Sequence, residues 1–251
     1  MQDSAPRKPR PSRSKAAKEA AAKAAARRPV WRQGLRWVGR GILGLAGVYL
    51  LLILLFAFVN PPGNLYMWSE SRRLGGVDQT SVNIEDVAPA MARSVVAAED
   101  ANYCLHWGFD MAAIREAVAE GSNRGASTLS QQVVKNVFLW QGRSWLRKAM
   151  EAVITPVMEL VWSKQRILEV YLNVAEFDEG VFGVQAAAQH YFDVDAADLT
   201  AVQAARLAAV LPDPKGRSAG KPSSFVRKRA GQIAGGADTI AADGRADCFE
   251  D

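Results

Sequence analysis

The longest apolar run of the chain lies near its N-terminus. No charged or strongly polar side chain interrupts residues Gly41 to Val59, and nineteen helical residues at about 1.5 Å each span roughly 28 Å, close to the hydrocarbon thickness of a bilayer. Trp31 and Trp37 precede the run, where an interfacial aromatic belt is expected. A cleaved signal peptide is the alternative, but the run is longer than a usual signal core and no small-residue cleavage site follows it. The pattern therefore predicts one uncleaved transmembrane helix.

Beyond Asn60 the apolar residues recur with helical spacing, which predicts a mainly α-helical body. The expected helices are 85–99, 127–138 with Ser127 as N-cap, one from Ser144, one from Ser163, and one with a capping box from Thr200 to Gln203 that stops at Pro212 and Pro214. The helix from Ser144 is expected to bury an apolar stripe that comprises Leu146, Ala149, Met150, Val153 and Val157. After about residue 230 the Gly, Ala and Asp content predicts a frayed tail.

Charge is distributed unevenly along the chain. Of 31 basic and 26 acidic residues, residues 1–40 hold 12 bases and 2 acids, so this tail carries +10 and the remainder −5. Residues 1–29 lack aromatic side chains and are expected to be disordered, and their positive charge predicts a cytoplasmic N-terminus. The basic pI therefore describes the tail, and no nucleic-acid-binding domain is implied. The predicted organisation is a basic cytoplasmic tail (1–40), an anchor (41–59), a folded domain (60–230) and a flexible C-terminal tail (231–251).

The sequence holds two cysteines and two histidines, which are Cys104, Cys248, His106 and His190. They are too few for a Cys-rich zinc module or a disulfide framework, so no protein-bound metal site is expected. Cys104 is interpreted as a packing residue and His106 as a structural hydrogen bonder.

Residues 99–110, EDANYCLHWGFD, place two carboxylates among three aromatic residues directly after a predicted helix. A carboxylate packed against these aromatic rings would be partly desolvated, which raises its pKa and suits it to proton transfer. The alternative is that Glu99 or Asp100 merely caps the loop.

Two further segments carry polar groups. Residues 124–136 place hydroxyls, two amides and Lys135 along one helical stripe, which suits the binding of a sugar or a phosphate, although a solvent-facing stripe is the alternative. Residues 142–151 place two cations three and four residues before Glu151, where a salt bridge within the helix is the simplest interpretation. Two separated acids with nearby cations favour glycosyl transfer from a phosphate leaving group, because a base would deprotonate a sugar hydroxyl while cations stabilise the departing oxygens.

These segments resemble the glycosyltransferase domain of peptidoglycan synthases, and most closely its single-domain branch, the monofunctional biosynthetic peptidoglycan transglycosylases. Five stretches match in order, before a Leu-Ala-rich helix that ends in LPDP (211–214): EDANYCLHWGFD (99–110), RGASTLSQQVVKN (124–136), RKAME (147–151), SKQRILEVYLN (163–173) and GVFGVQAAAQHYF (180–192). Five ordered motifs are far more specific than one. The resemblance covers about residues 65–230. It implies a lysozyme-like α-helical large lobe, a smaller membrane-contacting lobe, and a cleft between them for a lipid-linked disaccharide.

The resemblance also implies roles for individual residues. Glu99 is similar to the general base that activates the C4 hydroxyl of the acceptor sugar, and Glu151 resembles the second essential acid. Lys135 and Arg143 match the cations that contact pyrophosphate. Further positions expected to line the cleft are Ser127, Gln131, Gln132, Arg147, Lys148 and Asn173.

The implied reaction is attack of lipid II on the anomeric carbon of the growing glycan, with inversion and release of undecaprenyl diphosphate, at the outer face of the inner membrane. The expected partners are lipid II, the glycan chain, the membrane, and cell-wall synthesis or division proteins. A divalent cation, Mg²⁺ or Mn²⁺, could assist at the diphosphate, although no Asp-rich ligand set is visible.

A lytic glycosidase and a non-catalytic membrane scaffold are the alternatives. The cations argue against the first, because a glycosidase expels a sugar hydroxyl, and the two acids argue against the second.

Overall fold

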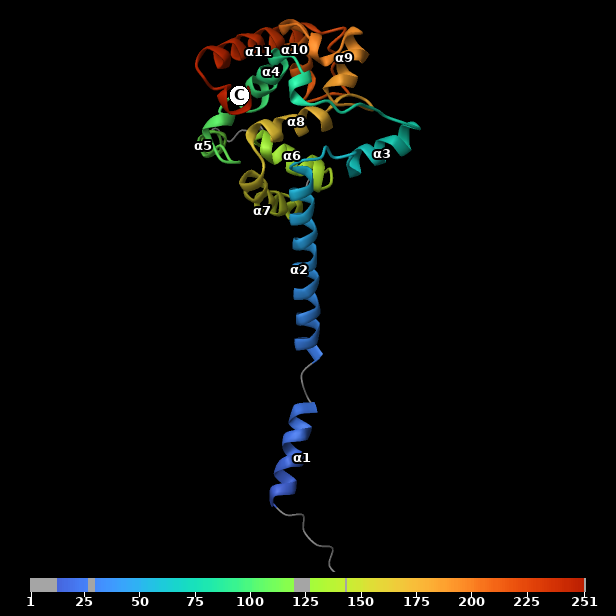
Figure 1. Ribbon diagram of the computed structural model, residues 1–251, viewed down its shortest axis with the longest axis vertical. Helices are drawn as coiled ribbons and strands as arrows, with labels where there is room; N and C mark the ends of the chain where they lie inside the picture. The colour runs from blue at the N-terminus through green and yellow to red at the C-terminus, as the bar shows by residue number, and fades with distance from the viewer. Residues whose placement is uncertain (1–12, 27–29, 120–126, 143, 251) are drawn as a thin grey trace, which may run out of the picture. The chain divides into compact units, whose positions relative to one another are not determined.

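A computed structural model describes residues 13–26, 30–119, 127–142 and 144–250 (Figure 1). The chain divides into two compact units, Met1–Leu51 and Leu52–Asp251. The first contains α1 (Arg13–Ala26), where disorder was expected, and most of α2 (Val30–Phe56). Helix α1 forms because alanine and lysine have high helix propensity, and this local preference does not require the burial of apolar surface.

The long apolar helix that was predicted near the N-terminus is present, but its bounds differ. Within the described residues, one helix is long and apolar enough to cross a membrane, and its candidate span is Gln33–Phe56 rather than Gly41–Val59. The helix begins early because the basic and aromatic residues before Gly41 are compatible with helical structure at a membrane interface. It ends early because Phe58 and Val59 already belong to the turn that leads to Pro61.

The second unit is mainly helical, as predicted. Its helices are α3 (Leu65–Leu74), α4 (Pro89–Glu99), α5 (Met111–Ala119), α6 (Leu129–Phe138), α7 (Trp145–Val161), α8 (Lys164–Val174), α9 (Val184–Phe192), α10 (Ala201–Val210), α11 (Ser224–Ala242) and α12 (Asp247–Glu250), with 3-10 turns at Ile84–Asp86, Tyr103–Leu105 and Ala196–Asp198. A small sheet has the order β1 (Asp78–Gln79), β3 (Val181–Phe182), β2 (Glu176–Asp178). In it, β3 pairs in parallel with β1 and antiparallel with β2.

Two helix groups build the core. Helices α4, α10 and α11 pack on one another, and α6 packs on α7 and α8 (Figure 1). Fully buried Met91, Leu207 and Ile233 tie the first group together, and Val133 and Leu168 lie between α6 and α8. The arrangement brings the C-terminal end of α4 to the side of α6, which is where the candidate site lies.

The last turn of α2 is part of the second unit. Ile53 is buried, and its carbonyl accepts a hydrogen bond from Trp162 Nε1 at 2.7 Å. The Arg166 guanidinium donates to the Phe56 carbonyl at 2.9 and 3.0 Å and to Asn60 Oδ1 at 2.6 Å. The Phe56 carbonyl at the C-terminus of the helix is thus satisfied by a side chain of the folded domain, while the Ile53 carbonyl also accepts the backbone N–H of Ala57 at 3.1 Å.

The expectation of a flexible tail over 231–251 is wrong for the described part of that range. Helix α11 continues to Ala242 because Ile233, Ala237 and Ile240 recur at helical spacing and are buried. Phe249 in α12 is also fully buried. Small residues allow α11 to pack closely, so the Gly-Ala content reflects helix packing and not fraying.

A disulfide joins Cys104 to Cys248 across 144 residues, with a Cα–Cα distance of 5.7 Å. The interpretation of Cys104 as a packing residue is therefore wrong. Arg93 pairs with Glu250 at 2.6 Å beside the disulfide, and Arg245 donates to the Ala101 carbonyl at 3.0 Å. The C-terminal segment is thus fastened to the loop that follows Glu99.

Three of the predicted helix starts are confirmed, since Ser144, Ser163 and Thr200 are N-caps whose side chains accept backbone N–H groups. Ser127 is not an N-cap. Thr128 caps α6 instead, and it forms a capping box with Gln131 that Ser127 could not form.

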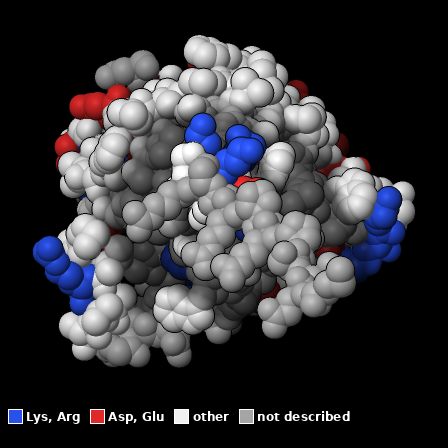
Figure 2. All heavy atoms as spheres, turned by 90° about the horizontal axis from the view of Figure 1, so that it is seen from below, with Lys and Arg blue, Asp and Glu red and all other residues white. Residues whose placement is uncertain are grey.

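Helix α7 packs with the opposite face from the one predicted. Leu146, Ala149, Val153 and Val157 are exposed, and Met150 is half-buried. The buried face instead contains Glu151, Ile154, Thr155, Met158 and Glu159. The acids tolerate burial because cations of the same region pair with them. Figure 1 places α7 at the end of the second unit where the last turn of α2 joins. In the view of Figure 2, the Lys and Arg side chains of the described residues form small, separate groups.

Candidate active site

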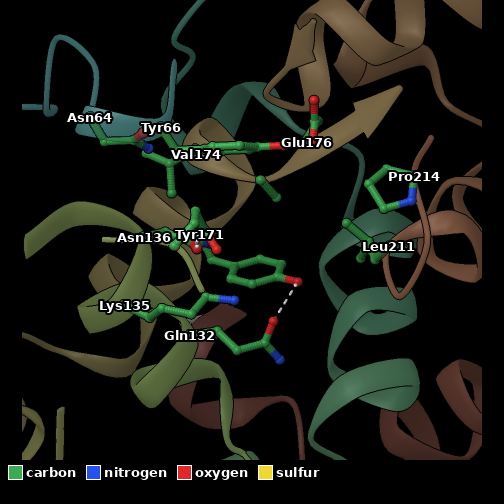
Figure 3. A pocket seen from close by; sticks show the side chains of 12 residues that line it. Asn64, Tyr66, Gln132, Lys135, Asn136, Tyr171, Val174, Glu176, Leu211 and Pro214 are labelled. Carbon is green, nitrogen blue, oxygen red and sulfur yellow. Dashed lines mark hydrogen bonds between the residues drawn. The ribbon is translucent and has the colours of Figure 1, made fainter. Parts of the chain in front are cut away.

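Glu99 lies at the meeting point of three helices. It is the last residue of α4, and Gln132 of α6 donates Nε2–H to its Oε2 at 2.9 Å. The Gln132 carbonyl oxygen in turn accepts from the Tyr171 hydroxyl of α8 at 3.4 Å, a contact drawn in Figure 3. Because Tyr171 engages the amide oxygen, the amide nitrogen of Gln132 is directed at the carboxylate.

Burial raises the pKa of Glu99 above its ordinary value. The hydrogen bond from Gln132 and the charges of Arg229 and Lys135 favour the ionised form, but they do not cancel the loss of water. The desolvation predicted for this carboxylate is therefore present. Tyr103 is one of the aromatic residues that were expected to desolvate Glu99. Its hydroxyl instead donates to the Lys164 carbonyl at 2.8 Å.

Asp100, the neighbour of Glu99, connects two helices through its carboxylate. One oxygen accepts the backbone N–H of Leu129 at 3.0 Å, and the other lies 2.8 Å from His106 Nε2. The carboxylate thus links the end of α4 to the first turn of α6. His106 is a structural hydrogen bonder, as predicted.

Glu151 has a different environment and is more deeply buried than Glu99. Arg147 donates to one of its oxygens at 2.8 Å, and Lys148 pairs with the other. Lys148 also donates to Ser127 Oγ at 3.0 Å, and Arg147 donates to the Gly142 carbonyl at 2.8 Å. The salt bridge within the helix is therefore present, and it extends to the segments on both sides of α6.

The charges of both acids act on the pKa of Lys135. Burial lowers the pKa of its ammonium, as do the charges of Arg147 and Lys148, while Glu151 and Glu99 act in the opposite direction. Among the described residues, no acid forms an ion pair with Lys135. A partly desolvated cation without a carboxylate partner is suited to bind an anionic ligand.

Lys135 and Gln132 line a pocket of about 270 Å³ (Figure 3). The other lining residues are Asn64, Tyr66, Asn136, Gln141, Tyr171, Val174, Ala175, Glu176, Leu211 and Pro214. Both side chains extend from α6 toward Tyr171 in Figure 3. A lining that combines polar and apolar groups is typical of a site that orients a ligand.

Sequence reasoning missed part of this pocket. Tyr171 was recognised as part of the matching stretch 163–173, and nothing singled out Asn64, Tyr66 or Glu176. The Tyr66 hydroxyl donates to Glu176 Oε2 at 2.7 Å across 110 residues, so only the fold brings them together. Asn136 and Leu211 did lie inside recognised motifs, which was the one available signal.

Seven of the predicted site residues that the structure describes do not line this pocket: Glu99, Glu151, Arg147, Lys148, Ser127, Gln131 and Asn173. Gln131 is buried, and its side chain accepts the backbone N–H of Thr128 in the capping box. Asn173 is buried and binds both backbone groups of Val82, with distances of 2.8 and 2.9 Å. Ser127 contacts Lys148 instead of the pocket. Arg143 lies outside the described residues.

Comparison with known proteins identifies the family of the chain. The transglycosylase family model matches residues 69–237. A biosynthetic peptidoglycan transglycosylase of Jannaschia sp. (strain CCS1) is 63% identical over 214 residues, which is 85% of this chain and 90% of the relative. One from Pseudomonas putida (strain GB-1) is 47% identical over 79% of this chain and 89% of its own length, and one from Xanthomonas axonopodis pv. citri (strain 306) is 47% identical over 80% and 87%. The matched range contains Glu99, Lys135 and Glu151, and the chain belongs to the transglycosylase family.

Proposed function

We propose that this chain polymerises lipid II into linear glycan strands by inverting glycosyl transfer, with release of undecaprenyl diphosphate, in bacterial cell-wall synthesis. Membership of the family supports the reaction class. The observation that carries the assignment of roles is the difference between two acids: half-buried Glu99 has a raised pKa and an amide partner, whereas buried Glu151 is held by two cations.

Glu99 acts as the general base in this proposal. It accepts the proton of the acceptor C4 hydroxyl as that oxygen forms a bond to the donor anomeric carbon. The bond from the anomeric carbon to the phosphate oxygen breaks, and its electron pair leaves with the diphosphate. A raised pKa makes the carboxylate a stronger base than an exposed glutamate.

Lys135 binds the departing diphosphate, with Arg147 and Lys148 adding positive charge nearby. Glu151 holds the two flanking cations in place and so acts as a positioning residue. Cations fixed before the reaction stabilise the charge that develops on the leaving oxygen without reorganising at the moment of bond cleavage. A glycosidase would need a protonated acid at that oxygen, and the cations disfavour this alternative.

The described residues contain no group of three or more His, Cys, Asp or Glu side chains that could hold a metal ion. Near Lys135, the carboxylate of Glu151 is already engaged by two cations. These residues do not fit a protein-held divalent cation, so we derive no step through one.

The apolar helix in Gln33–Phe56 serves as a single-pass anchor in the inner membrane. The basic residues before it support a cytoplasmic N-terminus and a periplasmic catalytic unit. The exposed apolar stripe of α7 supports contact with the outer leaflet, where a lipid-linked substrate is confined.

The test is incubation of the detergent-solubilised full chain with fluorescent lipid II, followed by gel separation with and without muramidase. A ladder that collapses under muramidase is the expected result. Folded protein that binds lipid II but yields no ladder would contradict the proposal and favour a non-catalytic scaffold.

A further inference from the structure

Helix α3 has a well-defined inner face. Met67 and Glu70 are buried against the second unit, and Tyr66 donates to Glu176 at 2.7 Å. Glu70 accepts from Lys215 at 2.8 Å, and Arg73 bridges Glu70 to Glu179. These contacts fix the orientation of the helix on the sheet, so its opposite face is equally fixed.

The outer face of α3 carries side chains suited to a membrane surface. Leu65 is 62% exposed and Trp68 56% exposed, and both lie with Arg72 on one helical stripe. The Arg72 guanidinium lies 3.9 Å from the centroid of the Trp68 ring. Tryptophan prefers the headgroup region of a bilayer, and an arginine whose guanidinium stacks on the ring can present its N–H groups to lipid phosphate.

The position of α3 in the chain is consistent with this environment. The candidate span ends at Phe56, and α3 begins at Leu65. Phe58, between the two helices, is 87% exposed. The last turn of α2 is fastened to the second unit by Trp162 and Arg166, so α3 and the end of the span belong to one folded body. Apolar exposure thus continues from the anchor onto α3.

We propose that the outer face of α3, defined by Leu65, Trp68 and Arg72, binds the surface of the phospholipid bilayer, with anionic headgroups at Arg72. Amphipathic helices of this type lie in the interface plane and add to the affinity of an anchor. A second consequence rests on the proposed function. Because Asn64 and Tyr66 line the pocket, a membrane-bound α3 holds that wall of the pocket at the leaflet from which the lipid-linked substrate enters.

The test uses full-length protein in vesicles of phosphatidylethanolamine and phosphatidylglycerol with a radiolabelled phospholipid tracer. The photoreactive residue p-benzoylphenylalanine replaces Trp68, and lipid adducts are counted after irradiation. Phe58 is the positive reference. Phe225 on α11 is the matched control, because it is 58% exposed and Arg217 lies 5.0 Å from its ring centroid. The thermal transition of each variant is measured to establish that it is folded.

We expect the adduct yield at position 68 to approach that at 58 and to exceed that at 225 at least about fivefold. A yield at 68 no higher than at 225, with strong labelling at 58, would overturn the proposal. So would cross-linking of position 68 to a protein in native membranes in place of lipid. The readout does not require polymerisation, so lipid adducts without glycan synthesis would reject the proposed function alone, and synthesis without adducts would reject the role of α3 alone.

Discussion

Glu99 and Glu151 are both withdrawn from water, yet their surroundings have opposite chemistry. Glu99 receives one side-chain hydrogen bond from a neutral amide, and burial raises its pKa. Glu151 is 2% exposed and is paired with Arg147 and Lys148. An acid without a cationic partner retains an affinity for a proton, whereas an acid neutralised by two cations serves mainly to hold those cations. Lys135 lies between them and responds to both charges.

Glu99→Gln is the variant with the largest expected effect, and it tests whether Glu99 differs from Glu151 in its role. We expect kcat to fall by about 10²- to 10⁴-fold, because the amide cannot accept the hydroxyl proton. The folded state binds the Glu99 proton more tightly than the unfolded chain does, so ionisation of Glu99 lowers stability as pH rises through the raised pKa. The variant should therefore keep or raise the melting temperature at neutral pH, and it should still bind lipid II. Retained turnover would remove Glu99 as the base.

Glu151→Gln should behave differently. It leaves Arg147, whose side chain is 12% exposed, and the more exposed Lys148 without their buried carboxylate partner, so we expect a loss of about 3 kcal/mol in the free energy of unfolding. Activity should fall by about 10- to 100-fold through misplaced cations. Chemical denaturation and lipid II turnover, measured on the same preparation, provide the check. A stable variant without activity would assign Glu151 to the chemistry itself.

Lys135→Ala tests the link between the two acids. It removes charge that binds the diphosphate both in the ground state and in the transition state, so KM should rise and kcat should fall, each by about tenfold. Lys135→Arg is the matched control and should recover part of the binding. An increase in KM alone would contradict the leaving-group role.

The smallest effect on activity is expected from Cys248→Ser. Loss of a native disulfide typically costs about 2–5 kcal/mol, so the melting temperature should fall. At 25 °C, turnover should change less than twofold, because Glu99 is oriented by α6 and α8 and not by the disulfide. A large loss of turnover in folded protein would show that the C-terminal segment controls the Glu99 loop.

Local signals made much of this fold predictable. The caps at Ser144, Ser163 and Thr200 depend on side chains within one helical turn, and ordered motifs located Glu99, Lys135 and Glu151. The face of α7 was predicted wrongly because hydrophobic periodicity takes no account of acids that are buried in ion pairs with nearby cations. Near a membrane, an apolar stripe can face lipid while paired acids turn inward.

Long-range contacts were beyond sequence reasoning. Asn173 lies in a recognised motif, but its side chain binds the backbone of Val82, 91 residues away. The pairing of Cys104 with Cys248 and the contact of Tyr66 with Glu176 have the same character. Neither spacing nor composition carries information about which distant segments meet.

The most direct test of the account is the pH dependence of kcat/KM for lipid II polymerisation in the wild type and in Gln132→Leu. If Glu99 is the base, the rate falls as pH decreases through its pKa, and burial places this acidic limb above the value of about 4.3 for an ordinary glutamate. Gln132 stabilises the ionised carboxylate, so its replacement should move the limb to still higher pH. A limb at the ordinary glutamate value, or one that Gln132→Leu leaves in place, would contradict the role of Glu99 as the buried base.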